Sequence, residues 1–297
     1  MSIADLDRVL TQEQQLVIGW LNRGTLHLVR REDYWWLHTL TTPPLHTANA
    51  RRLAQTGVTS PMAERGVSVI ERSLADEGPL TRNQLRDRLA AARVETKGQA
   101  LVHLLMLACL RGVAVRGPMV DGKHAYVLAR DWLPARSAVS RERALAELAL
   151  RYLAGHAPAD DRDLAKWAGL PLRDARAGLA SIARKLVEGD DGRLELKGEL
   201  PSLSPRVCLL DQWDPVLVGW RSRATLLGVY AERYPAEAYF RPFAYVGGRA
   251  VATWRSENGT VALQAPFVRL SRAARDALAD DAIDVERFLR GEPSARE

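Results

Sequence analysis

Cysteine is scarce in this sequence. The 297 residues include two cysteines, Cys109 and Cys208, and both stand in apolar runs. They offer neither a disulfide framework nor the paired spacing of a zinc site. We therefore expect the protein to work in a reducing compartment, the cytoplasm, and to hold no metal.

Long hydrophobic runs and common catalytic motifs are also missing. No stretch approaches the about 18 uninterrupted apolar residues that a membrane helix needs, and the first residues contain no apolar signal-peptide core. A Walker loop, a dinucleotide fingerprint and a Ser-His-Asp arrangement do not stand out either. These absences predict a cytoplasmic protein with no membrane partner and no cofactor.

Positive charge, in contrast, is in excess. Lys and Arg number 42 against 36 Asp and Glu, which gives a net charge of +6. Arginine dominates the basic set, and its forked donors suit phosphate or guanine. A hydrophobic content of 47% predicts a folded core. Composition alone leaves three explanations open, namely a nucleic acid partner, an acidic membrane surface, or solubility.

Residues 61–133 read as one compact unit. Apolar spacing predicts a helix over 63–76, Thr81 is placed to cap a second helix, and a strongly apolar third helix covers 98–110. Two β-prone runs then flank Asp121-Gly122, a good hairpin turn. Three helices followed by a hairpin outline a winged helix-turn-helix. The third helix has few polar base readers and is expected to be core.

Residues 140–200 repeat this outline after a linker at 131–140. Helices are predicted over 141–154, from 163, and over 173–187, followed by a hairpin around 190–192. Residues 1–60 resemble part of a further unit, with a helix over 12–21, a strand over 25–29 and a helix over 33–40. Residues 205–297 are β-rich, with strands over 240–246, 250–254 and 261–265 and a closing helix over 271–289. The predicted fold class is α+β, with tandem winged helix-turn-helix units and a β-rich C-terminal part.

Three segments carry a family resemblance: residues 20–29, 209–223 and 248–255. Together they resemble the winged-helix DNA glycosylases of the AlkZ and YcaQ type. The resemblance implies three stacked winged helices that cup duplex DNA. It also implies hydrolysis of the N-glycosidic bond of alkylated or crosslinked purines. The family's catalytic residues form a Gln-hydrophobic-Gln or Gln-hydrophobic-Asp triplet.

That triplet is expected several tens of residues before Arg23, whereas this sequence starts at Met1. Gln12-Glu13-Gln14 has a charged middle residue and lies too close, so no triplet of this kind is assigned. We therefore expect an N-terminally shortened member of the family, leave its catalytic residues unassigned, and leave open whether it is an enzyme.

The candidate DNA contacts come from the same three segments and from the residue that follows the first of them: Arg23, Thr25, His27, Arg30, Arg221, Arg223, Trp254 and Arg255. Arg23 and His27 face DNA, or else Arg23 pairs with a local acid and His27 is a satisfied strand histidine. Arg221 and Arg223 alternate, so in an extended segment they share a face. Trp254 is a wedge between bases or a core anchor. Asp214 acts on a sugar cation or forms a salt bridge or turn cap.

The expected partner is double-stranded DNA, alkylated or crosslinked, bound by a monomer. One alternative is a non-enzymatic winged-helix DNA-binding protein, such as a transcriptional regulator, which would bind selected sequences and dimerise on half-sites. Another is a truncated product with neither role, which would expose apolar surface within residues 1–40.

Overall fold

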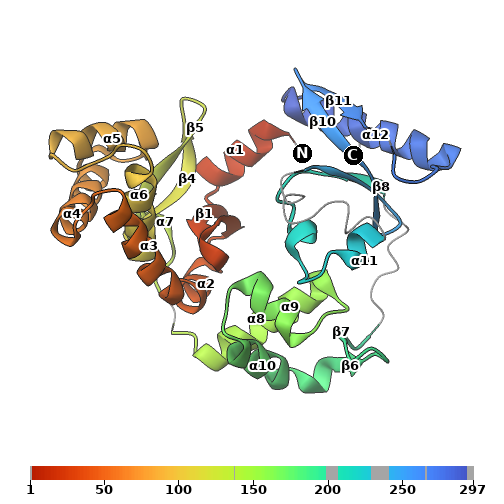
Figure 1. The fold of residues 1–297 in the computed structure, drawn as a ribbon. Coiled ribbons are helices and arrows are strands. Elements are labelled where there is room, and N and C mark those ends of the chain that lie inside the picture. The colour runs from red at the N-terminus through yellow and green to blue at the C-terminus, as the bar shows by residue number, and fades with distance from the viewer. Residues whose placement is uncertain (1, 137, 199–206, 229–240, 265, 293–297) are drawn as a thin grey trace. The chain divides into compact units, whose positions relative to one another are not determined.

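The computed structural model describes residues 2–136, 138–198, 207–228, 241–264 and 266–292. The chain divides into two compact units, residues 5–144 and residues 145–297 with the first four residues (Figure 1). The predicted strand limits at 240 and 265, and the predicted unit limits at 200 and 205, lie outside the described residues. Each unit is built from both helices and strands, so the fold class is α+β as predicted.

The unit of residues 5–144 contains most of its helices where the apolar spacing predicted them. Thr81 begins one of them with a capping box, because it accepts from the backbone of Gln84 while the Gln84 side chain accepts from the Thr81 N–H. The third predicted helix is buried along almost its whole length, as expected of core. The helices of this unit are α1 (Ile3–Thr11), α2 (Tyr34–Thr41), α3 (Pro43–Gln55), α4 (Ser60–Glu77), α5 (Arg82–Ala91), α6 (Ala100–Leu110) and α7 (Ala129–Trp132).

One five-stranded antiparallel sheet runs through this unit in the order β2-β1-β4-β5-β3. Its strands are β1 (Leu16–Trp20), β2 (Leu26–Arg30), β3 (Leu80–Thr81), β4 (Ala114–Val120) and β5 (Lys123–Leu128). The helix predicted over 12–21 is therefore wrong for residues 16–20. Val17 and Gly19 are buried while their neighbours are half-buried, which is the period of a strand. Ile18 pairs with Arg116, so the first strands share a sheet with residues 80–128.

In the second unit, three helices again precede a hairpin. These are α8 (Arg141–His156), α9 (Asp161–Ala168) and α10 (Leu172–Ser181), followed by the 3-10 turn η2 (Ala183–Lys185) and strands β6 (Leu186–Glu188) and β7 (Leu194–Leu196). The helix predicted over 173–187 is shorter, because Leu186, Val187 and Glu188 pair with β7 and leave the helix. Asp160 begins α9 with a second capping box.

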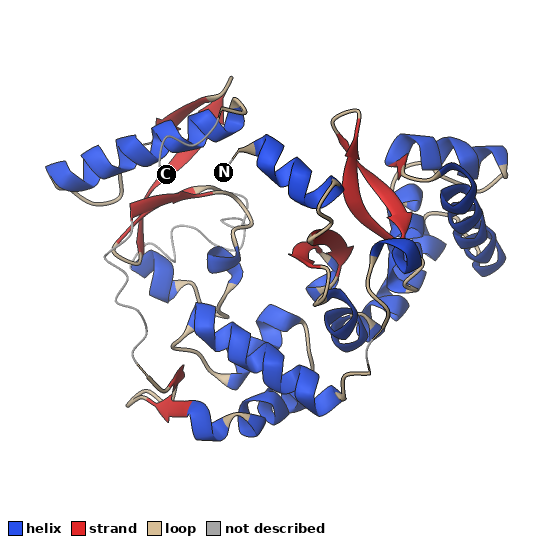
Figure 2. Cartoon of the chain, turned by 180° about the vertical axis from the view of Figure 1, so that it is seen from behind, coloured by secondary structure: helices blue, strands red, loops and turns tan. Residues whose placement is uncertain are grey.

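The remainder of this unit is a four-stranded antiparallel sheet in the order β11-β10-β9-β8. Helix α12 (Arg272–Leu289) packs beside it (Figure 2), and its Asp281 and Glu286 carboxylates accept the backbone N–H groups of Leu209 and Val261. The strands are β8 (Val207–Leu210), β9 (Phe243–Val246), β10 (Arg249–Glu257) and β11 (Thr260–Leu263), and between β8 and β9 lie η3 (Pro215–Val218) and α11 (Ala224–Leu227). The three predicted hairpin strands and the closing helix are confirmed.

Candidate functional site

In the unit of residues 5–144, the turn between β1 and β2 is held by its own polar groups. Thr25 Oγ1 donates to the Asn22 carbonyl at 3.2 Å, and His27 Nε2 lies 2.8 Å from Thr25 Oγ1 and 3.2 Å from the same carbonyl. Because a carbonyl can only accept, Nε2 must carry the hydrogen. Burial lowers the pKa of His27, and Arg23 nearby lowers it further against the raising effect of the Asn22 carbonyl. His27 is thus a satisfied histidine that fixes the turn.

Strand β2 presents an unusual outer face. Leu26 and Leu28 are 40% and 50% exposed and alternate with the half-buried His27. Arg30 follows on the same face, and its Nε lies 3.0 Å from Asp33 and 3.5 Å from Glu32. Glu32 is exposed, whereas Asp33 is buried. An exposed ion pair contributes little stability, so the Arg30 guanidinium can exchange the Glu32 carboxylate for a phosphate at small cost. Two exposed leucines form only a small apolar surface, and surfaces of this size are common on folded proteins, so they do not by themselves indicate a truncated product.

In the second unit, the candidate carboxylate Asp214 begins the 3-10 turn η3. Its Oδ1 accepts the Val216 N–H at 2.9 Å, so the turn-cap role considered for it is present. The side chain is half-buried, and burial raises the pKa of Asp214; Asp211 raises it further, while His156 and the Val216 N–H lower it. The carboxylate is therefore both fixed in position and poorly solvated.

His156 lies next to this turn in a cluster of aromatic rings. Its imidazole stacks on Tyr152 with ring centroids 5.0 Å apart, and the rings of Trp167 and Trp220 are each 5.4 Å away. Its Nε2 faces the Pro215 carbonyl at 3.4 Å. The Tyr152 hydroxyl donates to the Gly219 carbonyl at 2.8 Å. These contacts anchor residues 215–220 onto helix α8, and nothing in the local sequence pattern had indicated them.

Arg221 and Arg223 do not form the extended pair that was predicted. Arg221 lies in a bend where its N–H donates to Asp163 at 2.8 Å, and Arg223 is the residue before helix α11. The alternation argument fails because residues 215–227 are mostly helical turns. The Arg221 side chain is exposed, and within the described part of the chain no ion pair is recorded for it. Its guanidinium can therefore meet a phosphate without giving up a carboxylate.

Trp254 is a core residue and not a surface wedge. Its side chain is 7% exposed, and Nε1 donates to the Leu210 carbonyl at 2.9 Å, which ties β10 to β8. The expectation that Trp254 contacts DNA is therefore corrected, since the indole cannot leave this position without breaking the sheet. Arg255 points to the other face of β10, where it is exposed and pairs with Glu257 at 3.1 Å.

The chain contains one Gln-hydrophobic-Asp triplet, Gln212-Trp213-Asp214, which the sequence-based assignment did not include. It occupies the turn between β8 and η3, far along the chain from the place that the resemblance implies. The match to the triplet pattern therefore does not by itself give these residues the family's catalytic role, and any role of Asp214 has to be argued from its own surroundings. A search of the whole sequence for the triplet, and not only of the region before Arg23, would have found it.

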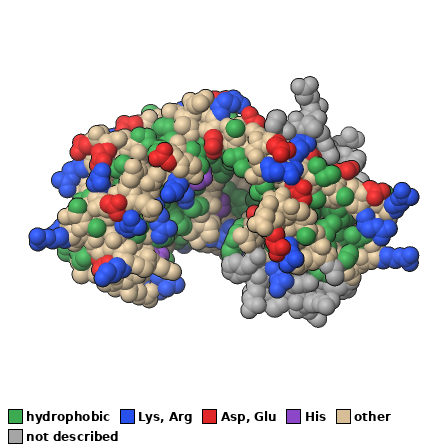
Figure 3. All heavy atoms as spheres, turned by 90° about the horizontal axis from the view of Figure 1, so that it is seen from above, with side chains coloured by type: hydrophobic (Ala, Val, Ile, Leu, Met, Phe, Trp, Pro, Cys, Tyr) green, Lys and Arg blue, Asp and Glu red, His purple; other side chains and the backbone are tan. Residues whose placement is uncertain are grey.

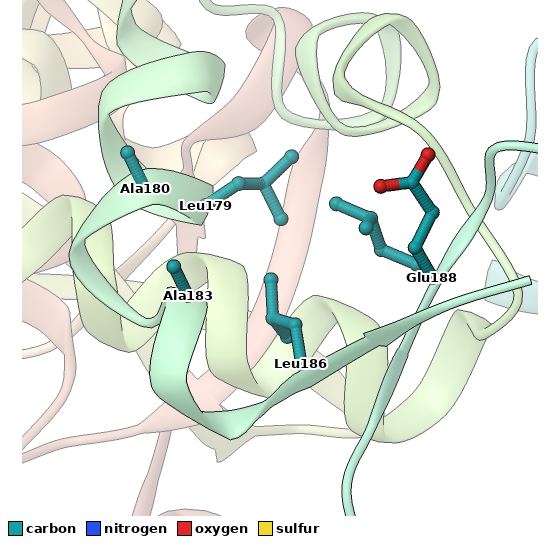
Figure 4. Close-up of a pocket in the computed structure, with 6 residues that line it drawn as sticks. Leu179, Ala180, Ala183, Leu186 and Glu188 are labelled. Atoms are coloured by element: carbon teal, nitrogen blue, oxygen red, sulfur yellow. The ribbon is translucent and has the colours of Figure 1, made fainter.

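Other features of the described surface give weaker indications of a binding site. Lys and Arg side chains are interspersed with Asp and Glu on the face shown in Figure 3. An open pocket of about 290 Å³ lies between α10, η2 and β6 (Figure 4). It is lined by apolar side chains and one carboxylate, that of Glu188, and by none of the candidate residues. Within the described ranges no group of acids, histidines and cysteines could hold a metal, and no helix is long and apolar enough to cross a membrane.

Acid is expected to destabilise the protein through its histidines. Burial is the main cause of a lowered pKa at His27, His38, His103, His124 and His156, relative to the ordinary value of 6.5. The unfolded chain then binds protons before the folded one does, so stability is present above pH 6.5 and falls as the pH drops through the lowered pKa values. Urea unfolding should therefore show a lower midpoint at about pH 5.5 than at about pH 7.5.

A matched variant tests the assignment of this effect to buried imidazoles. His156→Gln removes one titrating ring from the aromatic cluster and should reduce the difference between the two midpoints. For the wild-type chain, a urea midpoint at about pH 5.5 that equals or exceeds the midpoint at about pH 7.5 would contradict the prediction.

Comparisons with known proteins bear on the whole chain. A model of the family described as DNA glycosylase AlkZ-like matches residues 1–288. The solved structure of Streptomyces sahachiroi DNA glycosylase AlkZ is similar in fold, with a TM-score of 0.69 and 22% sequence identity over 98% of this chain and 81% of that chain. A search of curated proteins finds no match. At this identity the structural likeness concerns the fold alone, and the family match is what bears on activity.

Proposed function

The chain belongs to the AlkZ-like DNA glycosylase family, and from this premise we propose that it binds duplex DNA and hydrolyses the N-glycosidic bond of an alkylated purine. The observation that carries the proposal is the family match over residues 1–288, which includes both units of the structure. The fold similarity to AlkZ over 98% of this chain agrees with it. We also propose that the protein acts as a monomer and that its substrate is alkylated or crosslinked double-stranded DNA.

The arrangement of elements supports winged helices as the DNA-binding modules. Helices α4, α5 and α6 precede the β4–β5 hairpin, and α8, α9 and α10 precede the β6–β7 hairpin. This order is that of a winged helix-turn-helix, so residues 61–133 and 140–200 are each proposed to be one. Residues 1–60 are proposed as a partial unit and 205–297 as the β-rich part. Such modules hold duplex DNA largely through phosphates.

The proposed phosphate contacts are arginines in or directly next to the three family segments. Arg221 is exposed and has no ion pair among the described residues, and Arg255 pairs with the exposed Glu257. Arg30 pairs with the exposed Glu32 as well as with the buried Asp33. Phosphates compete well with the exposed carboxylates because the duplex has a dense line of charge. Arg23, Thr25, His27 and Arg223 belong to the same proposal; Thr25 and His27 contribute by fixing the turn that presents Arg23.

The chemistry requires little acid catalysis, because an N7-alkylpurine already carries positive charge. Water attacks C1′ of the sugar, the C1′–N9 bond breaks, and its electron pair neutralises the departing base. We assign the water's proton, and the stabilisation of positive charge on the sugar, to the Asp214 carboxylate. Asp214 suits this role because a cap holds it in place and burial weakens its solvation.

The proposal is tested with a duplex carrying one N7-methylguanine. Incubation with the purified chain is expected to produce abasic sites above the level of spontaneous depurination in the same buffer. Duplex binding without release would contradict the glycosylase proposal. Selective binding of particular undamaged sequences, together with a dimer in solution, would favour the transcriptional regulator instead.

A further inference from the structure

Helix α6 is the third helix before the β4–β5 hairpin, the position of the DNA-reading helix in a winged helix-turn-helix, but its side chains are covered. Nine of its eleven residues are buried, and the other two, Val102 and His103, are half-buried. Helix α3 packs along it (Figure 1), and α4, β1 and β4 contact it as well. The side chains of α6 are therefore not available to read a DNA groove.

A buried asparagine fixes α3 on α6. Asn49 is 2% exposed, its Nδ2 donates to the His103 carbonyl at 3.0 Å, and its Oδ1 lies 2.8 Å from His103 Nδ1. Because the amide oxygen can only accept, His103 Nδ1 carries the hydrogen. Separating the two helices would leave these buried groups without partners, which is costly. The covering of α6 by α3 is therefore part of the packed structure, and α3 presents its outer face to whatever approaches from this side.

The two helices belong to segments that contain no acidic residue. Residues 34–63 and residues 96–120 have neither Asp nor Glu, although the whole chain has 36 of them. The permanently charged side chains of α3 are Arg51 and Arg52, both exposed. Burial lowers the pKa of His103, and the positive charge of Arg52 lowers it further, so Arg52 lies near the α6 side of the helix. The contact between α3 and α6 thus joins two segments that add only positive charge to this surface.

The arginines of α3 keep their charge free for a partner. Arg52 Nη1 donates to Gln55 Oε1 at 3.1 Å, and neither Arg51 nor Arg52 forms an ion pair among the described residues. Gln55 is one turn after both arginines, so the three polar side chains are neighbours on the helix surface. Other arginines of the same unit are paired with glutamates, namely Arg88, Arg111 and Arg130. Exposed guanidinium groups in an acid-free surface attract an anion with several charges.

From these observations we propose that α3, and not α6, is the helix through which the unit of residues 5–144 holds duplex DNA, with Arg51 and Arg52 on backbone phosphates. The inference deepens the proposed function, on which it rests. The duplex carries one negative charge per about 1.7 Å of its axis, so two adjacent guanidinium groups can each find a phosphate. Phosphate contacts carry no sequence information. This unit therefore binds a duplex of any sequence, as a search for a damaged base requires.

The test compares duplex binding by the double variant Arg51→Gln/Arg52→Gln with binding by the wild-type chain. Glutamine forms helices about as well as arginine and has no charge. The matched control is Arg65→Gln/Arg72→Gln, which removes the same charge from exposed positions of α4, where glutamates stand directly before both arginines. Fluorescence anisotropy gives the Kd at several salt concentrations for three undamaged duplexes of unrelated sequence. Melting temperatures show that both variants are folded.

The α3 variant is expected to bind all three duplexes about tenfold more weakly, and the slope of log Kd against log salt should fall by about 2, because two phosphate contacts are lost. The α4 variant should stay within about twofold of the wild-type Kd.

An unchanged Kd for the α3 variant would overturn the inference while leaving the proposed function intact. Equal weakening by both variants would overturn it too, since net charge alone would then explain the effect. A loss confined to one of the three duplexes would indicate base contacts and would likewise overturn it. A wild-type chain that binds no duplex at all would instead contradict the proposed function.

Discussion

Replacing Asp214 by asparagine is expected to slow the release of 7-methylguanine by about 100-fold or more while leaving the unfolding midpoint unchanged. The two effects separate because the side chain has two roles. The amide oxygen of asparagine accepts the Val216 N–H as well as a carboxylate does, so the cap on η3 is kept. The negative charge that would receive the proton and stabilise the sugar cation is lost.

Asp211→Asn provides the matched control for this prediction. Asp211 is exposed, lies in the same turn, and also accepts a backbone N–H, that of Gln212. Release should therefore be close to that of the wild-type chain. Single-turnover assays at saturating enzyme measure the chemical step in both variants. Equal rates for Asp214→Asn and Asp211→Asn would contradict the assignment of Asp214 to the reaction.

Gly178→Ala is expected to destabilise the protein by about 2–3 kcal/mol, the cost of overpacking a tight contact. Gly178 lies in helix α10, where an added Cβ would stand 2.7 Å from the backbone carbonyl oxygen of Leu145 in helix α8. Because that oxygen belongs to a helix, it cannot move aside as a flexible side chain would. The two helices would have to separate and lose part of their packing.

Gly155→Ala separates this steric effect from helix propensity. Gly155 is an exposed position of helix α8, and a Cβ there would meet nothing within 4 Å. Alanine gains about 1 kcal/mol over glycine in both helices, so Gly155→Ala should be stabilising while Gly178→Ala is not. Urea unfolding, monitored by circular dichroism, shows whether each substitution raises or lowers the free energy of unfolding. A stabilised Gly178→Ala would show that α8 and α10 are less tightly packed than the structure has them.

Local signals in the sequence were sufficient for much of the fold. The capping residue Thr81, the apolar run of α6 and the Asp-Gly and Asn-Gly turns each correspond to an element or a turn in the structure. The strand β1 was missed because its residues are too few to separate a period of two from a helical one, and its partner β4 is far along the chain. Helix α3 was missed because Pro43-Pro44 resembles a break, although proline is well tolerated in the first helical turn.

The segments that form the candidate site could be predicted from the sequence, whereas the arrangement of their side chains in space could not. The family segments include the turn at 211–214, but whether a side chain is exposed or buried depends on its neighbours in space. Trp254 proved to be core because Leu210 of another strand accepts its N–H. Tyr152, His156 and Asp163 of helices α8 and α9 anchor residues 215–221, which follow this turn, and they lie some 50 to 70 residues earlier in sequence.

The pairing of Ile18 with Arg116 has a consequence for how the chain is made. The β1–β2 hairpin is synthesised before β4, yet a two-stranded hairpin alone is marginally stable in water. Its stabilising neighbour β4 leaves the ribosome only after more than 80 further residues have been added. At about 5–20 residues per second, the exposed leucines of β2 wait for several seconds beside an incomplete sheet. Folding of this unit during translation is therefore completed from its C-terminal side, and a slow or paused ribosome would prolong the interval in which chaperones can bind the first strands.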